Sequence, residues 1–328
     1  MQLATLPNST RDGALAVVSR DHCRAVLASE IATTLQDALE RWSEVEPQLR
    51  CLAAALEAGT ATGSFAFEAG KALAPLPRAW QWLDGSAYES HGDLMQQVLD
   101  IEPIPRGTPL MYQGVSSHFY NSTDDIPFLS EEKGIDFEGE FGVIVDAVPM
   151  GITPQAALKH IRLVMQINDW SLRALAGPEM KTGFGWVQAK PPCSVAPVAV
   201  TPDALGRHWR DGRVDLPLHV TWNDALFGLV QGYPMGFGFH ELVAHAAATR
   251  DLVAGTIIGS GTVSNANFKE VGSTCIAERR GIEVIDHGAP KTDFMKFGDR
   301  VRMESRFPDG SPLFGAINQK IVRKEAFE

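Results

Sequence analysis

Two glutamates separated by a single residue, Glu138 and Glu140, are the chemically most informative feature of this sequence. They lie in the segment GIDFEGEFGVIV, whose last five residues are typical of a buried strand. Residues i and i+2 point to one face of a strand, so the two carboxylates would lie side by side. A hard divalent cation with oxygen ligands would offset their repulsion and desolvation. The alternative is a solvated edge where both glutamates face water.

Two aspartates could add to such a site, although neither indicates one alone. Asp169 lies beside a tryptophan in INDWSLR, and Asp84 lies in WLDGSAYESH. In isolation, Asp169 is typical of a cap or turn residue and Asp84 of an Asp-Gly turn. Their interpretation therefore depends on the segments around them.

The elements that must position these acids are mostly short strands. Apolar runs bounded by turn residues predict strands at 15–19, 141–148, 195–200, 216–221 and 256–259. Helical spacing of apolar residues predicts a helix over 34–58. Cap signals predict two more, over 154–166 and over 240–253.

These elements predict an α+β chain that is mainly β, with a closed or rolled sheet. We expect a small N-terminal domain over residues 1–75 and a larger domain over residues 76–328. No dinucleotide-binding fingerprint or phosphate-binding loop is present, since GSGTVSN at Gly259 has neither the spacing nor the lysine.

The amino-acid composition disfavours nucleic acids and membranes as binding partners. The 328 residues include 40 acidic and 29 basic side chains, for a net charge of −11, which disfavours nucleic acid as a partner. No apolar run approaches the roughly 20 residues of a membrane span, and the first residues lack the apolar region of a signal peptide. Four scattered cysteines do not form a disulfide or zinc pattern. We therefore expect a cytoplasmic protein that contacts neither membrane nor nucleic acid.

Over about residues 80 to 320 the chain resembles the fumarylacetoacetate hydrolase family. Five blocks in the same order and spacing carry the resemblance: DFEGE at 136–140, NDWSLR at 168–173, AKPPCSVAP at 189–197, GTIIGSGTVSN at 255–265 and GSTCIAE at 272–278. The region before them is similar to the accessory domain of the longer members. The resemblance implies a mixed β-roll catalytic fold, a homodimer, and hydrolysis of a carbon–carbon bond in a small β-diketo acid, as in aromatic-compound or tyrosine catabolism.

Site residues follow from the resemblance position by position. The expected ligands of a divalent cation (Mg²⁺, Mn²⁺ or Ca²⁺) are Asp84, Glu138, Glu140 and Asp169. The expected catalytic residues are His91, Glu278, Lys190 and Arg173, and the expected substrate contacts are Thr262, Arg173 and Lys190. The spacing of seven residues between Asp84 and His91 matches the family pattern.

Three departures from the family pattern bear on specificity more than on metal binding. Leu172 stands where alanine usually follows the NDWS core. Position 176 is alanine, where hydrolases of fumarylacetoacetate carry glutamine, and Cys193 stands near a position usually occupied by threonine. We expect these changes to alter how a substrate is oriented.

The implied mechanism assigns a separate task to each group. His91 would take a proton from water, with Glu278 orienting its imidazole, while Lys190 and Arg173 stabilise the enolate that leaves. For each residue a structural role is the alternative, such as an exposed loop lysine or a surface histidine. Two rival functions also stay open: a decarboxylase, hydratase or isomerase of a short keto-diacid on the same metal scaffold, and a catalytically silent metal-binding member.

Overall fold

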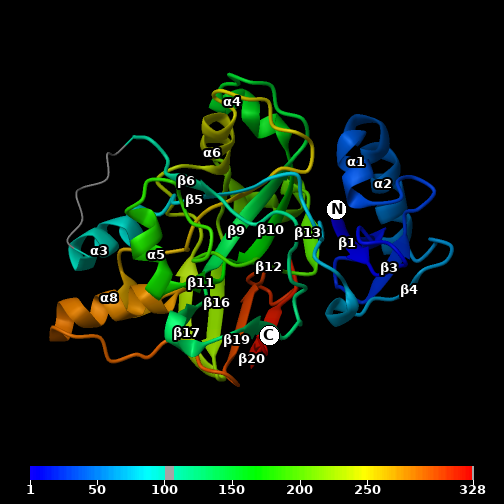
Figure 1. Ribbon diagram of the computed structural model, residues 1–328. Coiled ribbons are helices and arrows are strands. Elements are labelled where there is room, and N and C mark those ends of the chain that lie inside the picture. The colour runs from blue at the N-terminus through cyan, green and yellow to red at the C-terminus, as the bar shows by residue number, and fades with distance from the viewer. Residues whose placement is uncertain (100–106, 327–328) are drawn as a thin grey trace.

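The computed structural model describes residues 1–99 and 107–326 and is built mainly from β-sheets (Figure 1). The largest sheet has eleven strands, arranged in the order β4-β3-β2-β1-β13-β10-β9-β18-β5-β6, with β12 paired to β10. Its strands are β1 (Gln2–Leu6), β2 (Ala14–Val18), β3 (Arg24–Leu27), β4 (Phe65–Ala66), β5 (Trp82–Gly85), β6 (Met111–Gln113), β9 (Gly139–Val145), β10 (Ile161–Asn168), β12 (Ser194–Val195), β13 (Val198–Val200) and β18 (Ile257–Gly259).

A five-stranded sheet, in the order β17-β16-β19-β20-β7, packs against part of the large one. It consists of β7 (Ile126–Phe128), β16 (Pro217–Trp222), β17 (Ala225–Gln231), β19 (Arg300–Ser305) and β20 (Ile317–Arg323). Two short pairs complete the strands: β8 (Ile135–Asp136) with β11 (Ser171–Leu172), and β14 (Trp209–Arg210) with β15 (Arg213–Val214).

Helices lie around the sheets. The α-helices are α1 (Leu35–Glu40), α2 (Trp42–Glu57), α3 (Glu89–Leu99), α4 (Pro154–Ala157), α5 (Arg173–Met180), α6 (Phe239–Ala246), α7 (Phe268–Val271) and α8 (Ile276–His287). Short 3₁₀ segments occur at Ala69–Lys71, Glu131–Lys133, Leu158–His160 and Pro202–His208. Within residues 1–99 and 107–326, no helix is both long and apolar enough to cross a bilayer.

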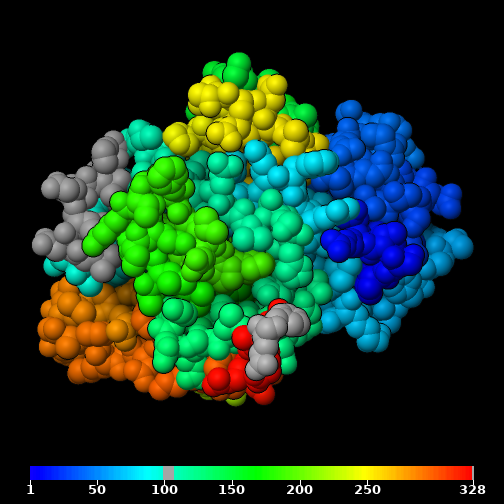
Figure 2. Space-filling view, in the orientation of Figure 1, coloured from blue at the N-terminus to red at the C-terminus, as the bar shows by residue number. Residues whose placement is uncertain are grey.

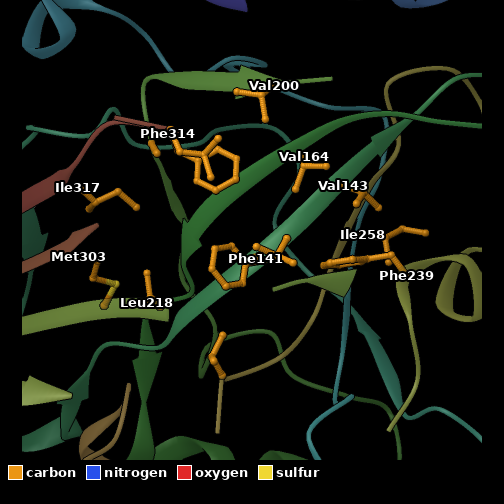
Figure 3. Packing of buried hydrophobic residues seen from close by; sticks show 14 of the residues in the cluster. Phe141, Val143, Val164, Val200, Leu218, Phe239, Ile258, Met303, Phe314 and Ile317 are labelled. Atoms are coloured by element: carbon orange, nitrogen blue, oxygen red, sulfur yellow. The ribbon is translucent and has the colours of Figure 1, made fainter. Parts of the chain in front are cut away.

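Strand alternation divides the core into two clusters. On β9, Phe141 and Val143 face the cluster that also contains Leu218 and Met303 of the second sheet (Figure 3). Ile144, the residue after Val143, points to the opposite face of the strand and into the other cluster, which α1 and α2 cover. The central strands are therefore buried on both faces, which accounts for the continuous apolar runs of the sequence.

The N-terminal region continues the same sheet. Strand β1 pairs antiparallel with β13, with Leu3 opposite Ala199, and β2 and β3 follow outward. In the space-filling view the N-terminal segment (blue) forms one flank of the molecule (Figure 2). The mainly β fold with an added N-terminal part is confirmed, whereas a domain boundary near residue 75 stays a prediction.

The prediction of a helix over residues 154–166 is wrong. Thr153 and Pro154 do start a helix, and the Thr153 hydroxyl accepts from the amide of Ala156, but α4 stops at Ala157. Strand β10 then begins at Ile161. Its apolar residues gain a full ladder of hydrogen bonds with β9, and this tertiary pairing outweighs the local helical spacing.

Two other helices differ from expectation in length. The segment 34–58 forms α1 and α2, because Arg41 adopts a non-helical conformation between them. The helix expected over 240–253 is α6, which ends at Ala246, so Gly255 does not cap it. The strand expected over 195–200 is interrupted between β12 and β13, where Pro197 lacks the amide hydrogen that a ladder needs.

Candidate metal and catalytic site

Strands β5, β9 and β10 bring three buried carboxyl groups together. Asp84 lies on β5, Glu140 on β9, and Asp169 directly after β10. Strand β18 lies between β5 and β9, with Gly259 opposite both Asp84 and Gly142. One carboxylate oxygen from each acid lies within 4.8 Å of the other two, and all three side chains are buried. We call Asp84, Glu140 and Asp169 the acid cluster.

The acid cluster offers oxygen ligands that could hold a cation. Among the described residues, neither carboxylate oxygen of Glu140 has a hydrogen-bond partner, although the residue is fully buried. Burial first, and then the charges of Asp84 and Asp169, raise the pKa of Glu140 well above its usual range. Burial and Asp169 likewise raise the pKa of Asp84. An all-oxygen donor set of this kind fits Mg²⁺, Mn²⁺ or Ca²⁺.

Glu138 occupies different surroundings from Glu140. Its Oε1 accepts from Lys190 Nζ at 2.7 Å and from the Ser171 hydroxyl at 2.6 Å, and lies 2.8 Å from a guanidinium nitrogen of Arg173. Its Oε2 accepts from the Thr262 hydroxyl at 2.6 Å. Burial alone would raise the pKa of Glu138, but Arg173 and Lys190 outweigh it and hold that pKa well below the usual value.

The NDW block, residues 168–170, fixes Glu138 and Asp169 through hydrogen bonds of its backbone as well as of its side chains. The Asn168 side chain accepts from the amide of Glu138 at 3.0 Å, and the amide of Asp169 donates to the Glu138 carbonyl at 3.0 Å. Trp170 is fully buried and donates its indole hydrogen to Ser194. Each residue of the block therefore has a defined structural task.

Asp169 receives three side-chain donors. Lys190 Nζ lies 2.6 Å and the Tyr112 hydroxyl 2.8 Å from its Oδ2, while Cys193 Sγ lies 3.0 Å from its Oδ1. Lys190 thus bridges Asp169 and Glu138. Burial disfavours its charge, but these two carboxylates raise the pKa of Lys190, which stays protonated.

Arg173 connects the site to the start of α8. Its Nε donates to Asp136 Oδ2 at 2.7 Å. Asp136 also accepts from the backbone amides of Ile276 and Ala277, at 2.7 and 2.9 Å. A buried carboxylate at a helix N-terminus is favoured by the free amides and the helix dipole. Asp136 therefore fixes both Arg173 and the helix that carries Glu278.

His91 and Glu278 form a partly buried pair. His91 lies in the first turn of α3 and Glu278 in the first turn of α8, and the two helices pack together. His91 Nδ1 lies 2.9 Å from Glu278 Oε2, and the Ser273 hydroxyl donates to Glu278 Oε1 at 3.0 Å. Glu278 is fully buried, whereas the His91 side chain is 16% exposed.

The structure thus places the residues that the sequence suggested in three groups. Asp84, Glu140 and Asp169 form the acid cluster, to which Lys190 joins Glu138. Glu138 in turn contacts Arg173 and Thr262. His91 and Glu278 form a pair of their own, and Glu138 lies among cations rather than inside the acid cluster.

Two family models match the chain. The model of the fumarylacetoacetate hydrolase C-terminal region matches residues 81–322, and that of fumarylacetoacetase N-terminal domain 2 matches residues 1–78.

The chain belongs to the fumarylacetoacetate hydrolase family.

Its relatives within the family include hydrolases and isomerases. A 2,4-didehydro-3-deoxy-L-rhamnonate hydrolase of a Sphingomonas species is 24% identical over 54% of this chain and 59% of that protein, so the match spans less than two thirds of the relative. A maleylpyruvate hydrolase of Sphingobium, solved with manganese(II) and pyruvate, has a TM-score of 0.65 at 17% identity, with 99% of this chain and 100% of that chain covered. A 5-carboxymethyl-2-hydroxymuconate delta-isomerase of Mycobacterium smegmatis has a TM-score of 0.61 at 16% identity and the same coverage.

Sequence reasoning missed two residues that contact the candidate site. Asp136 stands two residues before Glu138, so the alternation of acids in DFEGE was a signal, but its partners lie 37 and 140 residues away. Tyr112 lies in the short strand β6, whose sequence has no distinctive pattern, and no local signal connects it to Asp169.

Proposed function

We propose that this chain is a divalent-metal-dependent hydrolase that cleaves a carbon–carbon bond in a β-diketo acid. The observation that supports it most is a buried acid cluster joined by Lys190 to Glu138. Seven residues after Asp84 on β5, the chain carries His91, which pairs with Glu278. One short stretch of chain thereby supplies a metal ligand and a base.

Asp84, Glu140 and Asp169 would hold the cation, with Glu138 next to them. A divalent cation there would polarise the keto oxygens of the substrate and favour its enolised form. Which of Mg²⁺, Mn²⁺ and Ca²⁺ is used is an open part of the proposal, and the manganese in the Sphingobium relative supports Mn²⁺ as the first one to try.

Lys190 and Arg173 would bind the oxygens on which negative charge develops. Lys190 is buried and Arg173 is partly buried. Carboxylates hold each cation from two sides, Lys190 by Glu138 and Asp169, and Arg173 by Asp136 and Glu138. Donors fixed before the reaction need no reorganisation as charge forms, which is the main source of electrostatic catalysis. Thr262 would either keep Glu138 in place or turn to the substrate carboxylate.

His91 would act as the general base toward water. Glu278 accepts a hydrogen bond from Ser273, and its other carboxylate oxygen lies beside His91 Nδ1. In the proposed mechanism His91 would donate from Nδ1 to this oxygen, and Nε2 would take the proton from water. The buried carboxylate also stabilises the imidazolium that then forms. Water adds to the acyl carbonyl, the carbon–carbon bond breaks, and the departing enolate takes a proton at carbon.

Isomerase, hydratase or decarboxylase chemistry is the second candidate, and the structural likeness to a delta-isomerase favours keeping it. Such reactions use a stabilised enolate but do not strictly need water activated by a His–Glu pair. A catalytically silent metal-binding member would show no turnover at all. The expected homodimer and small keto acid substrate belong to the proposal, and sedimentation would measure the oligomeric state.

Replacing the base separates these candidates. For His91→Ala we expect hydrolysis of diketo acids, followed by loss of ultraviolet absorbance, to fall about 10²-fold or more, with metal binding retained. His287→Ala, on the exposed end of α8, is the matched control and should keep full activity. Full hydrolysis by His91→Ala, or activity that is insensitive to chelator, would contradict the proposal.

A further inference from the structure

The two cations of the proposed mechanism are joined by one short stretch of chain. Arg173 begins helix α5, and Lys190 follows the turn and extended segment that come after this helix. Lys190 is 5% exposed, and its Nζ bridges Glu138 and Asp169. The amine stays between these two carboxylates only if the backbone that leads into Lys190 is itself held in place.

Glu179, in the last turn of α5, binds the segment that precedes Lys190. Its Oε2 accepts from the amides of Val187 and Ala189, both at 3.0 Å, and its Oε1 accepts from the amide of Gln188 at 2.9 Å. These amides, that of Gln188 foremost, hold the pKa of Glu179 below its usual value, so the carboxylate is ionised near neutral pH. Hydrogen bonds to an ionised acceptor are roughly twice as strong as those between neutral groups.

Two further hydrogen bonds join the same segment to α5. The carbonyl of Ala189 accepts from the amide of Leu172, the residue before the helix, at 2.8 Å. The indole Nε1 of Trp186 donates to the carbonyl of Ala176 at 2.9 Å. Ala189, the immediate neighbour of Lys190, is therefore held by both its amide and its carbonyl group.

Residues 181–185, which connect α5 to this segment, add little packing of their own. All five are exposed, and Phe184 is 97% exposed. Gly183 and Gly185 have positive φ, and a Cβ at either position would meet no atom within 4 Å. Few buried contacts mean low local stability. The position of residues 187–189 therefore depends on their polar contacts with α5.

We propose that Glu179 is a positioning residue that holds Lys190 in place for the reaction. The inference rests on the proposed hydrolase function, in which Lys190 binds an oxygen that gains negative charge. Without Glu179, three consecutive amides lose their acceptor and water competes for them. Lys190 then moves relative to Glu138 and Asp169. A misplacement of about 1 Å is enough to lower a rate about 10²-fold.

Replacing Glu179 by glutamine tests this assignment. Glu179→Gln keeps the size of the side chain but has no charge and only one acceptor oxygen. With Mn²⁺-loaded protein and loss of diketo-acid absorbance as the readout, we expect kcat to fall at least about tenfold, with KM changed less than about threefold. Mn²⁺ affinity should stay within about twofold, because Glu179 lies outside the acid cluster. An unchanged kcat in folded Glu179→Gln would overturn the assignment.

Glu283→Gln is the matched control, because Glu283 makes the same kind of contact outside the candidate site. It lies on α8, and its Oε2 accepts from the amides of Lys291 and Thr292 at 2.6 and 2.8 Å. Both variants should lower the melting temperature, whereas only Glu179→Gln should lower kcat. An equal loss of kcat in the two variants would show a general effect of destabilisation and count against a positioning role.

Pyruvate binding separates this inference from the proposed function. Pyruvate accompanies manganese in the Sphingobium relative. If the natural chain hydrolyses no diketo acid, the hydrolase proposal fails, and calorimetry with pyruvate and Mn²⁺-loaded protein still tests Glu179. We expect Glu179→Gln to weaken pyruvate binding at least about fivefold in the natural chain but less than about twofold in Lys190→Ala, because Glu179 acts through Lys190. Equal weakening in both backgrounds, or no pyruvate binding by a natural chain that is also inactive, would overturn the inference.

Discussion

Glu138 and Glu140 are one residue apart, yet their carboxyl groups experience opposite electrostatic surroundings. Glu138 contacts two cations and two hydroxyl groups, which lower its pKa despite burial. Glu140 faces other acids without a partner among the described residues, and burial with those acids raises its pKa. An ionised Glu140 is therefore stable only when a further positive charge is present, which supports the proposed cation site.

Replacing Glu140 by glutamine should affect the metal-free and metal-bound protein in opposite ways. Without metal, Glu140→Gln removes repulsion from the acid cluster, so we expect the melting temperature to rise or stay level. With Mn²⁺, the stabilisation seen for the natural chain should be mostly lost, because a ligand is missing. Thermal melts with Mn²⁺ and with EDTA measure both effects.

Glu304→Gln is the matched control for this experiment. Glu304 is also buried, but it pairs with Arg302 and Arg306 on the other sheet. Its loss should lower the melting temperature and leave the Mn²⁺-dependent increase unchanged. A full Mn²⁺ response in Glu140→Gln would remove that residue from the proposed ligands.

The raised pKa values of Asp84 and Glu140 give a pH dependence with a defined sign. Folded metal-free protein holds protons that the unfolded chain releases near the ordinary pKa values of 3.8 and 4.5. Their contribution to stability is thus present below these values and is lost as pH rises toward the raised pKa values. Metal binding must displace the protons, so calorimetry in buffers of different ionisation enthalpy should detect proton release. Release of no protons between pH 5 and 7 would contradict this.

At the scale of elements, β18 and the loop after it support Asp84 through glycines. The amide of Gly261 donates to Asp84 Oδ1 at 3.1 Å, and Gly261 has a φ of +75°. A Cβ at this position would lie 2.5 Å from the carbonyl oxygen of Gly85. The loop can therefore approach Asp84 only without a side chain.

Adding a methyl group at Gly261 should disturb metal binding as well as stability. For Gly261→Ala we expect the free energy of unfolding to fall by about 2–4 kcal/mol, because of strain at positive φ and the clash with Gly85. We also expect weaker Mn²⁺ affinity, because Asp84 must move. Gly288→Ala is the control: Gly288 caps α8 at φ +79° with open space around it. The free energy of unfolding of Gly288→Ala should fall by about 1 kcal/mol, and its Mn²⁺ affinity should not change. Denaturant unfolding and metal titration measure both quantities, and equal Mn²⁺ affinities would disprove the coupling.

What the sequence reveals at this scale depends on how local the signal is. Strand β9 is predicted well because its apolar run is buried on both faces and short. Strand β10 is missed because Thr153 and Pro154 give a genuine helix start, and only pairing with β9 ends that helix early. The pairing of His91 with Glu278 spans 187 residues, so family resemblance suggests it whereas local pattern does not. Asp136 and Tyr112 were missed for the same reason.

At the scale of the whole molecule, one sheet runs through both parts of the chain. Leu3, Leu15 and Val17 of the N-terminal strands share a buried cluster with Ile144 of β9 and Leu163 of β10. The strands that carry Glu140 and precede Asp169 therefore depend on the N-terminal region for one face of their packing. Separate unfolding of the two parts would expose this cluster to water, which is unfavourable.

This shared core predicts that metal binding stabilises the N-terminal strands at a distance. If the chain unfolds as one cooperative unit, Mn²⁺ at the acid cluster lowers the population of every globally unfolded form by the same factor. Amides of β1 and β2 that exchange by global unfolding should therefore slow as much as those of β9 and β10. Hydrogen exchange with Mn²⁺ and with EDTA measures this, and Leu3→Ala should weaken protection in all four strands, whereas Leu27→Ala, 48% exposed on β3, should not. Slowing confined to β5, β9 and β10 would instead show that residues 1–75 unfold on their own, as a separate domain would.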